Sequence, residues 1–162
     1  MIQITSTIGV GNTALGAFDN ALYKTGVANY NLLRLSSVIP YGEGVQVVEV
    51  AKPGGKWGDK LYVVMAIQTE TEKGKSAAAG IGWARDKSNP KRGLFVEHEH
   101  ESLDKVKELI TDSLGDLFET RGLEKSEIEM ETVSGVVEDK PICAFVVAVF
   151  EDEDWRTLGE SL

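Results

Sequence analysis

The spacing of apolar residues predicts a chain dominated by β-strands. In the first run, residues 2–8, Ile2, Ile4 and Ile8 share one face of the expected strand. Later runs with strand-like patterns lie near residues 30–36, 45–51, 60–68, 76–84, 92–98, 127–136 and 141–150. The connections between some of them contain glycine or proline, as at residues 39–44, 53–55 and 86–90.

Two segments have helical periodicity instead. Asn12 is expected to cap a helix that runs to about Thr25, and Gly26 suits its C-terminal end. The apolar positions of this helix are Leu15, Phe18 and Leu22. Ser102 is expected to cap a second helix, residues 103–121, which ends at Gly122. The apolar stripe of the second helix consists of Leu103, Val106, Ile110, Leu114 and Leu117.

These elements predict one α+β domain. Two helices among seven or so strands favour a layered architecture, and the alternating strands favour mostly antiparallel pairing. The 162 residues suit a single domain, residues 1–162, that buries about 70% of the surface of its unfolded chain. No repeat, linker or low-complexity tract divides the sequence. The acidic residues 151–154 are expected to form a solvated tail.

The charge is uneven along the chain. The net charge is −9, yet residues 1–36 carry +1 and the remainder carries −10. The nearly neutral first segment is therefore expected to be woven into the core. An acidic chain disfavours a nucleic acid as its main partner, since phosphate backbones bind basic faces. It is compatible with a cationic small substrate.

The sequence also predicts the compartment. The N-terminus lacks a basic segment followed by an apolar run, so no signal peptide is expected. No apolar stretch approaches the roughly 20 residues that a membrane helix needs. The single cysteine, Cys143, lies in the apolar run of residues 142–150 and is expected to be a buried thiol. These features predict a cytoplasmic protein with no membrane partner.

A glycine-rich string raises the possibility of a dinucleotide site. Residues 9–14 read GVGNTA, a GxGxxA pattern between an expected strand and helix. A dinucleotide fold also needs an acid about 20 residues further on, and the region near Asn29 and Asn31 has none. The downstream strands do not alternate with helices either. We interpret these glycines as turn and helix-entry residues.

The run Glu97-His98-Glu99-His100-Glu101 raises the possibility of a metal site. On a strand, the two histidines face one way and the three glutamates face the other. Two histidines need a third ligand, to which the sequence does not point, so we expect a polar strand end and no metal. A carboxylate in this run could still be catalytic.

The stretch from residue 17 to residue 40 resembles a known family. It reads AFDNAL at residues 17–22, GV at 26–27 and NYNLLRLSSVIP at 29–40, which is similar to the signature of the pyruvoyl-dependent arginine decarboxylases. GLFVE at residues 93–97 is similar to the strand that supplies that family's catalytic acid. The resemblance implies a four-layer αββα sandwich. It also implies a homotrimer or dimer of trimers with sites between subunits. Residues 52–60 and the tail after about residue 150 look peculiar to this chain.

The resemblance implies self-cleavage between Ser36 and Ser37. The Ser37 hydroxyl would attack the Ser36 carbonyl to give an ester, and elimination would release residues 1–36 as a β chain. Residues 37–162, the α chain, would then begin with a pyruvoyl group made from Ser37. This covalent cofactor replaces pyridoxal phosphate and requires no metal.

The resemblance also implies how arginine is decarboxylated. A Schiff base between the pyruvoyl group and arginine would lose CO2, and Glu97 would protonate Cα to give agmatine, which feeds polyamine synthesis. The apolar approach of residues 94–96 would keep that acid protonated. Asp19 is expected to bind the guanidinium, Asn31 to orient the substrate or the scissile carbonyl, and Ser36 to line the pocket.

One geometric conflict and two alternatives stay open at this point. If residues 31–37 are extended, Asn31 and Ser37 lie roughly 20 Å apart, so they share a site only if the chain turns or a neighbouring subunit supplies one of them. The alternatives are a related pyruvoyl decarboxylase acting on another amino acid, such as histidine, and an unprocessed, non-catalytic oligomeric domain. The latter would keep Ser37 as serine in an intact chain.

Overall fold

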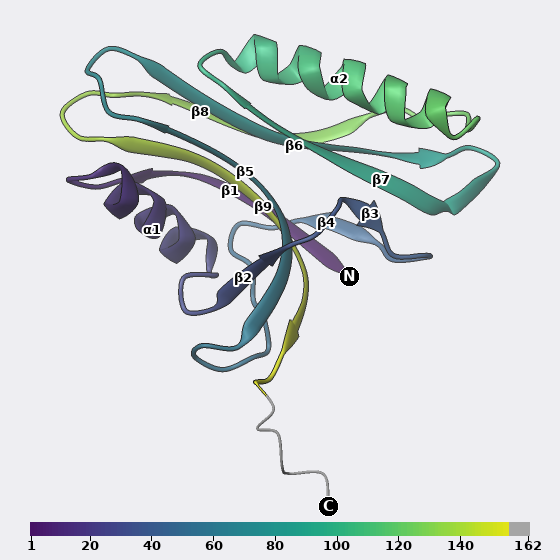
Figure 1. Ribbon diagram of the computed structural model, residues 1–162, viewed down its shortest axis with the longest axis horizontal. Helices are drawn as coiled ribbons and strands as arrows, with labels where there is room; N and C mark the ends of the chain where they lie inside the picture. Colours follow the sequence, from purple (N-terminus) through teal and green to yellow (C-terminus); the bar gives the residue numbers. More distant parts are fainter. Residues whose placement is uncertain (156–162) are drawn as a thin grey trace, which may run out of the picture.

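The computed structural model describes residues 1–155 of the chain and contains two helices and nine strands in that part (Figure 1). The helices are α1 (Ala14–Thr25) and α2 (Leu103–Thr120). The strands are β1 (Ile2–Val10), β2 (Asn31–Arg34), β3 (Val38–Ile39), β4 (Val45–Val47), β5 (Lys60–Glu70), β6 (Ser76–Asp86), β7 (Asn89–His100), β8 (Glu129–Val136) and β9 (Ile142–Glu153). Neither helix of the described part is long and apolar enough to cross a membrane.

The strands form two sheets with mostly antiparallel pairing. The five-stranded sheet has the order β2-β5-β9-β1-β4, and the four-stranded sheet has the order β3-β7-β6-β8. Among the strands of residues 1–155, only the two edge pairs of the larger sheet, β2 with β5 and β1 with β4, are parallel. Strand β1 therefore lies inside its sheet, between β9 and β4. The α+β prediction with mostly antiparallel sheets is confirmed.

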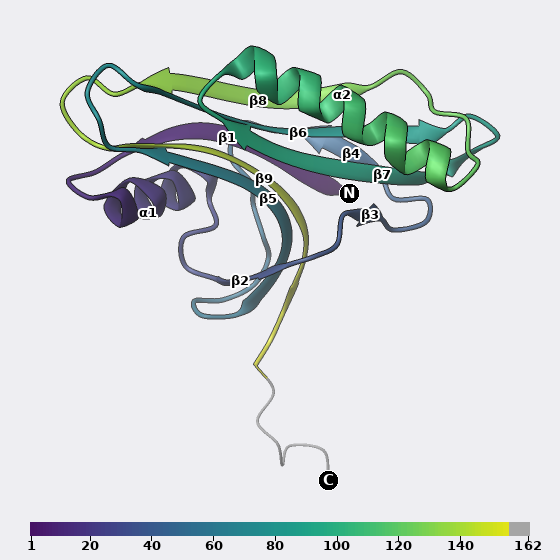
Figure 2. The same ribbon diagram turned by 45° about the horizontal axis from the view of Figure 1, so that its top comes forward.

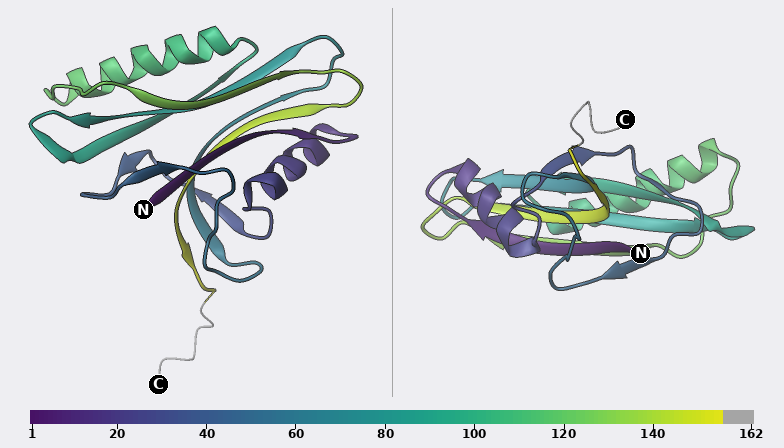
Figure 3. Two further views of the ribbon diagram at one scale, coloured as in Figure 1. Left: turned by 180° about the vertical axis from the view of Figure 1, so that it is seen from behind. Right: turned by 90° about the horizontal axis from the view of Figure 1, so that it is seen from below.

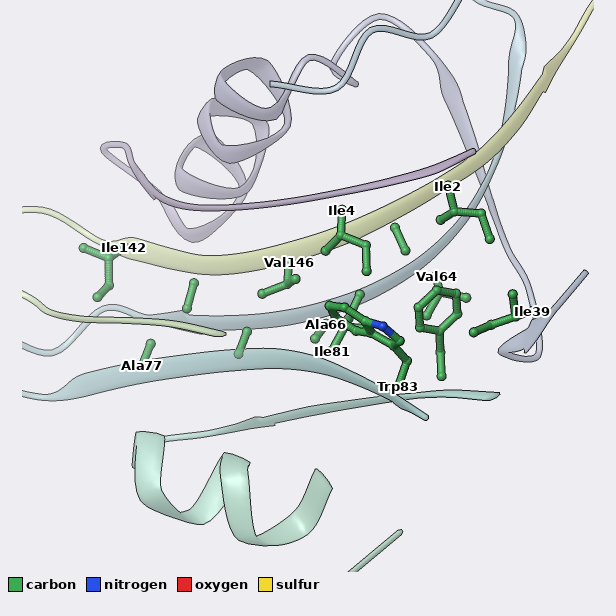
Figure 4. Close-up of a cluster of buried hydrophobic side chains, with 14 of the residues drawn as sticks. Ile2, Ile4, Ile39, Val64, Ala66, Ala77, Ile81, Trp83, Ile142 and Val146 are labelled. Atoms are coloured by element: carbon green, nitrogen blue, oxygen red, sulfur yellow. The ribbon is translucent and has the colours of Figure 1, made fainter. Parts of the chain in front are cut away.

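The sheets face each other, and each helix covers an outer face (Figures 1 and 2). Views from behind and from below place α1 and α2 on opposite sides of the paired sheets (Figure 3). One buried cluster lies between the sheets, where Ile4 and Val146 point toward Ile81 and Trp83 (Figure 4). A second cluster joins α1 to the larger sheet through Ala17 and neighbours, and a third joins α2 to the smaller sheet. The predicted apolar face of the first strand is confirmed, since Ile2 and Ile4 are fully buried and Ile8 packs against the same cluster.

The ends of α1 correct one prediction and confirm another. The N-cap is Thr13 rather than Asn12, because Thr13 has an extended backbone and its Oγ1 accepts a hydrogen bond from the Gly16 amide at 2.9 Å. Asn12 is exposed one position too early for that bond. At the other end, Gly26 has a φ of 86°, the left-handed conformation that favours glycine, as predicted.

Helix α2 matches its prediction closely. The Ser102 side chain accepts a hydrogen bond from the Lys105 amide, and the buried residues recur at helical spacing. These residues are Val106, Ile110, Leu114 and Phe118. Phe118 was not predicted, while Leu103 and Leu117 are only partly buried against the same cluster. At the end of the helix, the buried position is therefore Phe118 and not the predicted Leu117.

Several strand boundaries differ from the prediction, most clearly at the acidic tail. Residues 151–153 are not a solvated tail but the end of β9, paired with β5. Glu153 contacts both Lys60 Nζ at 2.9 Å and the Tyr62 hydroxyl at 2.7 Å. Acidic side chains are tolerated there because the pairing uses the backbone and leaves the side chains near solvent. Strands expected at residues 30–36 and 45–51 are shorter, and the pair flanking residues 87–88 is longer.

Candidate active site

The Ser36–Ser37 peptide bond lies where the chain crosses from one sheet to the other. Before it, the Leu35 amide donates to the Val63 carbonyl at 2.8 Å in the five-stranded sheet. After it, the Ser37 carbonyl accepts from the Phe95 amide at 2.8 Å, and β3 continues this pairing with β7. The scissile bond predicted from the sequence is thus held by a different sheet on each side.

Ser37 has an unusual backbone conformation. Its φ is 71°, and it is the only non-glycine residue with a positive φ in the described part of the chain. This left-handed region costs an ordinary residue about 1–2 kcal/mol. The hydrogen bonds of Leu35 and Ser37 to opposite sheets hold the chain in this conformation. Such outliers cluster at functional sites, so the backbone conformation by itself makes Ser37 a candidate functional residue.

The Ser37 side chain meets Glu97. Its Oγ lies 2.9 Å from Oε1 and 2.8 Å from Oε2 of Glu97, and both residues are half-buried. Glu97 shares a face of β7 with the fully buried Phe95, which belongs to the cluster between the sheets. Leu94 and Val96 belong instead to the cluster under α2, so of the three apolar residues that precede Glu97 only Phe95 shares its face.

A second carboxylate lies on the same face. Glu99 follows Glu97 at the strand period, so both point away from α2. Partial desolvation raises the pKa of Glu99 above its ordinary value, and the Arg34 cation opposes the rise. Arg34 ends β2, three residues before Ser37. Glu97 thus contacts Ser37 directly, while Glu99 lies two residues further along the same strand face and is influenced by the charge of Arg34.

The two histidines have structural partners on the opposite face. His98 Nε2 lies 2.7 Å from Ser113 Oγ of α2, and His100 Nδ1 accepts from the Ser102 amide at 3.0 Å. Within residues 1–155, no group of three or more histidine, cysteine, aspartate or glutamate side chains is arranged to hold a metal ion. The predicted alternation of histidine and glutamate faces is confirmed.

The glycines of the GxGxxA string serve packing. A Cβ on Gly9 would lie 2.1 Å from the Ala17 carbonyl oxygen, and one on Gly11 would lie 2.5 Å from the Ala17 nitrogen. These contacts bring β1 close to α1, where Ala17 and Ala21 are fully buried. The interpretation of this string as turn and helix-entry residues agrees with that close approach.

Asp19 and Asn31 lie apart from the Ser37–Glu97 pair. Asp19 is exposed on α1, one turn from the exposed Leu15 and one turn from the exposed Tyr23. Asn31 is exposed at the start of β2, with its Nδ2 2.7 Å from the Gly58 carbonyl oxygen. The β2 strand separates Asn31 from the Ser36–Ser37 bond, because its three extended steps span about 10 Å. Asn31 therefore does not reach the Ser37–Glu97 pair within one copy of the chain, whereas the exposed Ser36 adjoins Ser37.

An apolar pocket adjoins the residues that follow Ser37. It has a volume of about 290 Å³ and is lined by Val38, Ile39, Leu94, Phe118 and Leu123, among others. Ser37 and Glu97 do not line it.

Sequence reasoning missed three features of this region. These are the left-handed Ser37, the electrostatic effect of Arg34 on Glu99, and the loop of residues 53–59 that contacts Asn31. A possible signal for the loop was its PGGKWGD composition, which is rich in turn residues. Neither of the other two has a local sequence signal, because each depends on how distant strands pair.

Comparison with known proteins connects this geometry to a family. A family model described as pyruvoyl-dependent arginine decarboxylase (PvlArgDC) matches residues 1–154. A protein of that name from Halobacterium salinarum is 36% identical over 157 residues, covering 94% of this chain and 95% of that protein. One from Thermococcus kodakarensis is 34% identical over 144 residues, covering 86% and 87%. One from Methanococcus maripaludis is 32% identical over 152 residues, covering 91% and 87%.

Proposed function

Because the chain belongs to the pyruvoyl-dependent arginine decarboxylase family, we propose that it converts L-arginine to agmatine and CO2 with a pyruvoyl group made from Ser37. One observation carries the assignment to Ser37. Its hydroxyl contacts both oxygens of Glu97 at 2.8–2.9 Å while its backbone is held in a left-handed conformation at the crossing between sheets. Neither a histidine substrate nor a non-catalytic role is favoured by any contact described above.

The residues present fit a pyruvoyl group at position 37. The carbonyl of residue 37 survives the conversion, and the Phe95 amide that donates to it at 2.8 Å would keep it in place. Glu97 would face the carbon that now bears the hydroxyl. The chemistry supplied by such a group is an electron sink for the carbanion left at Cα when CO2 departs.

Maturation begins with proton transfer and attack within the chain. Glu97 accepts the proton of the Ser37 hydroxyl, and Oγ attacks the Ser36 carbonyl carbon. The peptide C–N bond breaks, the nitrogen of residue 37 takes a proton, and an ester joins the two residues. Loss of the Cα proton and cleavage of the Cβ–Oγ bond then release the Ser36 carboxylate and leave dehydroalanine. Addition of water and loss of ammonia leave a ketone at residue 37, with no change in oxidation state overall.

In turnover, Glu97 returns a proton. The same carboxyl faces Ser37, so a substrate joined to residue 37 would bring its Cα near Glu97, and the protonated form of Glu97 would protonate that carbon after CO2 leaves. One residue thus removes a proton during maturation and donates one during turnover.

The remaining predicted residues require a second copy of the chain. Asn31 is exposed and separated from Ser37 by the length of β2, and Asp19 is exposed on α1, whereas the Ser37–Glu97 pair needs further walls to enclose a substrate. Asp19 lies between two exposed apolar side chains, Leu15 and Tyr23, which suit a contact with another copy. We propose that, across this contact between copies, the Asp19 carboxylate binds the substrate guanidinium. The Asn31 side-chain amide would contact the reacting groups beside Ser37. A homotrimer, or a dimer of trimers, closes such contacts by rotation.

The two products of cleavage would stay together as one domain. Residues 1–36 contain β1, which lies between β9 and β4, and its Ile2 and Ile4 are fully buried. The new ends separate at the crossing without disturbing either sheet. We propose the cytoplasm as the compartment, since the only cysteine, Cys143, is a free buried thiol whose pKa is raised to about 12 by that burial.

The test is the denatured mass of the purified protein, followed by a CO2-release screen over amino acids. We expect two fragments, residues 1–36 and 37–162, the larger one with a ketone-reactive end, and release of CO2 from arginine alone. An intact chain after long incubation at neutral and mildly acidic pH would exclude the proposal. Cleavage with CO2 release from histidine instead would retain the chemistry and replace the substrate.

A further inference from the structure

The loop of residues 53–59 and the tail residue Trp155 converge on Asn31. The backbone N–H of Asn31 donates to the Asp59 carbonyl at 2.8 Å, and the backbone N–H of Gly58 donates to the Asn29 carbonyl at 2.7 Å. The Tyr30 hydroxyl donates to the Gly55 carbonyl at 2.9 Å. Three consecutive residues around Asn31 are therefore attached to one loop, which has no part in the chemistry described above.

The side chain of Asn31 is oriented by the Gly58 carbonyl. This oxygen can only accept, so the Asn31 Nδ2 must face it, and the 2.7 Å contact fixes which end of the amide points inward. The Oδ1 then points away, with no hydrogen-bond donor among residues 1–155. The indole Nε1 of Trp155 donates to the same Gly58 oxygen, so both of its lone pairs are used.

Asp59 closes the turn that presents this carbonyl. Its Oδ2 accepts from the Lys56 amide at 2.7 Å, its own amide donates back to the Lys56 carbonyl at 3.1 Å, and it is only 8% exposed. Gly58 lies inside that turn with a φ of 86°. An added Cβ on Gly55 would lie 3.0 Å from Asp59 Oδ2, so the carboxylate fills the loop.

We propose that Asp59 is a positioning residue that, through the turn of residues 56–59, fixes the Asn31 amide with Oδ1 facing the reacting groups. The inference rests on the role given to Asn31 in the proposed function. A carboxamide that rotates by 180° presents two donors where an acceptor is needed, so fixing its direction selects one of two chemically opposite surfaces. Asp59 itself touches neither substrate nor Ser37.

The experiment is a double-mutant cycle between Asp59→Ala and Asn31→Ala, read by kcat and by the rate of Ser36–Ser37 cleavage. We expect Asp59→Ala alone to lower kcat about tenfold to a hundredfold, since small misplacements of a positioned group have effects of this size. In the Asn31→Ala background it should lower kcat no further, because there is no amide left to orient. Asp59→Asn keeps an acceptor for the Lys56 amide and should retain most of the activity.

Two further variants guard against a simple loss of structure. Trp155→Phe changes an exposed tail residue and removes one of the two donors to Gly58, so we expect a loss in kcat of about two- to tenfold, again absent in the Asn31→Ala background. Glu70→Ala is the matched control. Glu70 also accepts from two backbone amides of a turn, Thr71 and Glu72, and its loss should leave kcat unchanged.

The outcomes separate this inference from the proposed function. Full activity of Asn31→Ala would remove the role of Asn31 itself, and Asp59 would lose its purpose with it. If Asn31→Ala lowers kcat but Asp59→Ala does not, the positioning role alone is overturned. The same holds if both variants lower kcat and the two losses multiply in the double variant. A loss of activity in Asp59→Asn equal to that in Asp59→Ala would also overturn it, by assigning the effect to the charge.

Discussion

The Ser37 hydroxyl lies 2.9 and 2.8 Å from the two carboxylate oxygens of Glu97, sixty residues further along the chain. Ser37 begins the segment that enters the smaller sheet beside β7, and Glu97 lies on β7 itself. The contact therefore depends on the chain crossing between sheets at this point. Substitution of either residue tests its proposed role in cleavage and turnover.

Ser37 is expected to be required for cleavage, whereas Ser36 is not. Ser37→Ala removes the oxygen that attacks and leaves, so the chain should remain intact by denatured mass and inactive. Ser37→Cys retains a nucleophile and should cleave slowly. Ser36→Ala is the matched control, because it keeps the carbonyl under attack and loses only an exposed hydroxyl. Cleavage of Ser37→Ala at the same bond would contradict the assignment.

Glu97 is expected to affect turnover more than maturation. Glu97→Gln keeps an amide oxygen that can accept from the Ser37 hydroxyl, so it should cleave, more slowly. The amide cannot donate a carboxylic proton, so kcat for arginine should fall about 10²- to 10⁴-fold, the usual contribution of a general acid. Glu97→Leu can neither accept from the Ser37 hydroxyl nor donate a proton to Cα, so it should fail in cleavage as well as in turnover. A mature and fully active Glu97→Gln enzyme would show that another residue protonates Cα.

Asp19 is expected to act on substrate binding alone. Asp19→Asn replaces a charged partner of the guanidinium by a neutral one, so KM for arginine should rise about ten- to a hundredfold. Ser36–Ser37 cleavage, followed by mass, should continue at the original rate. Asp112→Asn, at an exposed position of α2, is the matched control and should change neither quantity. An unchanged KM in Asp19→Asn would remove the guanidinium assignment.

Strand β1 is expected to hold the two fragments together after cleavage. Ile4 is fully buried between the sheets, so Ile4→Ala should lower the free energy of unfolding by about 2–5 kcal/mol. Val136→Ala removes an exposed side chain and should change it by no more than about 0.5 kcal/mol. Urea denaturation measures both. In native size-exclusion chromatography, residues 1–36 should elute with residues 37–162, and their separation without denaturant would contradict this account.

Glu99 is expected to make stability depend on pH. Its pKa is raised in the folded protein, chiefly by desolvation, so the folded state binds a proton that the unfolded state releases at lower pH. Stability from this group is present below the unfolded pKa of about 4.3 and is lost as pH rises through the folded pKa. Thermal unfolding from pH 4 to 7 should therefore show wild type losing stability relative to Glu99→Gln. Glu101→Gln, at an exposed position, serves as the control. Parallel pH profiles for wild type and Glu99→Gln would exclude the effect.

Local patterns predicted most elements because their causes are local. Gly26, Ser102 and the alternation of His98 with Glu97 and Glu99 each follow from the backbone conformation of a few neighbouring residues. The same reasoning failed at residues 151–153, where acidic side chains suggested a solvated tail. Backbone pairing with β5 extends the strand there, and side-chain polarity on a solvated face does not oppose it.

The candidate site, too, was partly predictable from the sequence and partly decided by long-range contacts. The sequence by itself, through its resemblance to a family, determined Ser36, Ser37, Glu97, Asp19 and Asn31 as the residues of interest. Only the tertiary structure decided that Ser37 meets Glu97, that Asn31 lies at the far end of β2, and that its side-chain amide contacts a turn closed by Asp59. The physical reason is that these contacts join residues up to sixty positions apart. Their distances are set by strand pairing and sheet stacking, which no short stretch of sequence specifies.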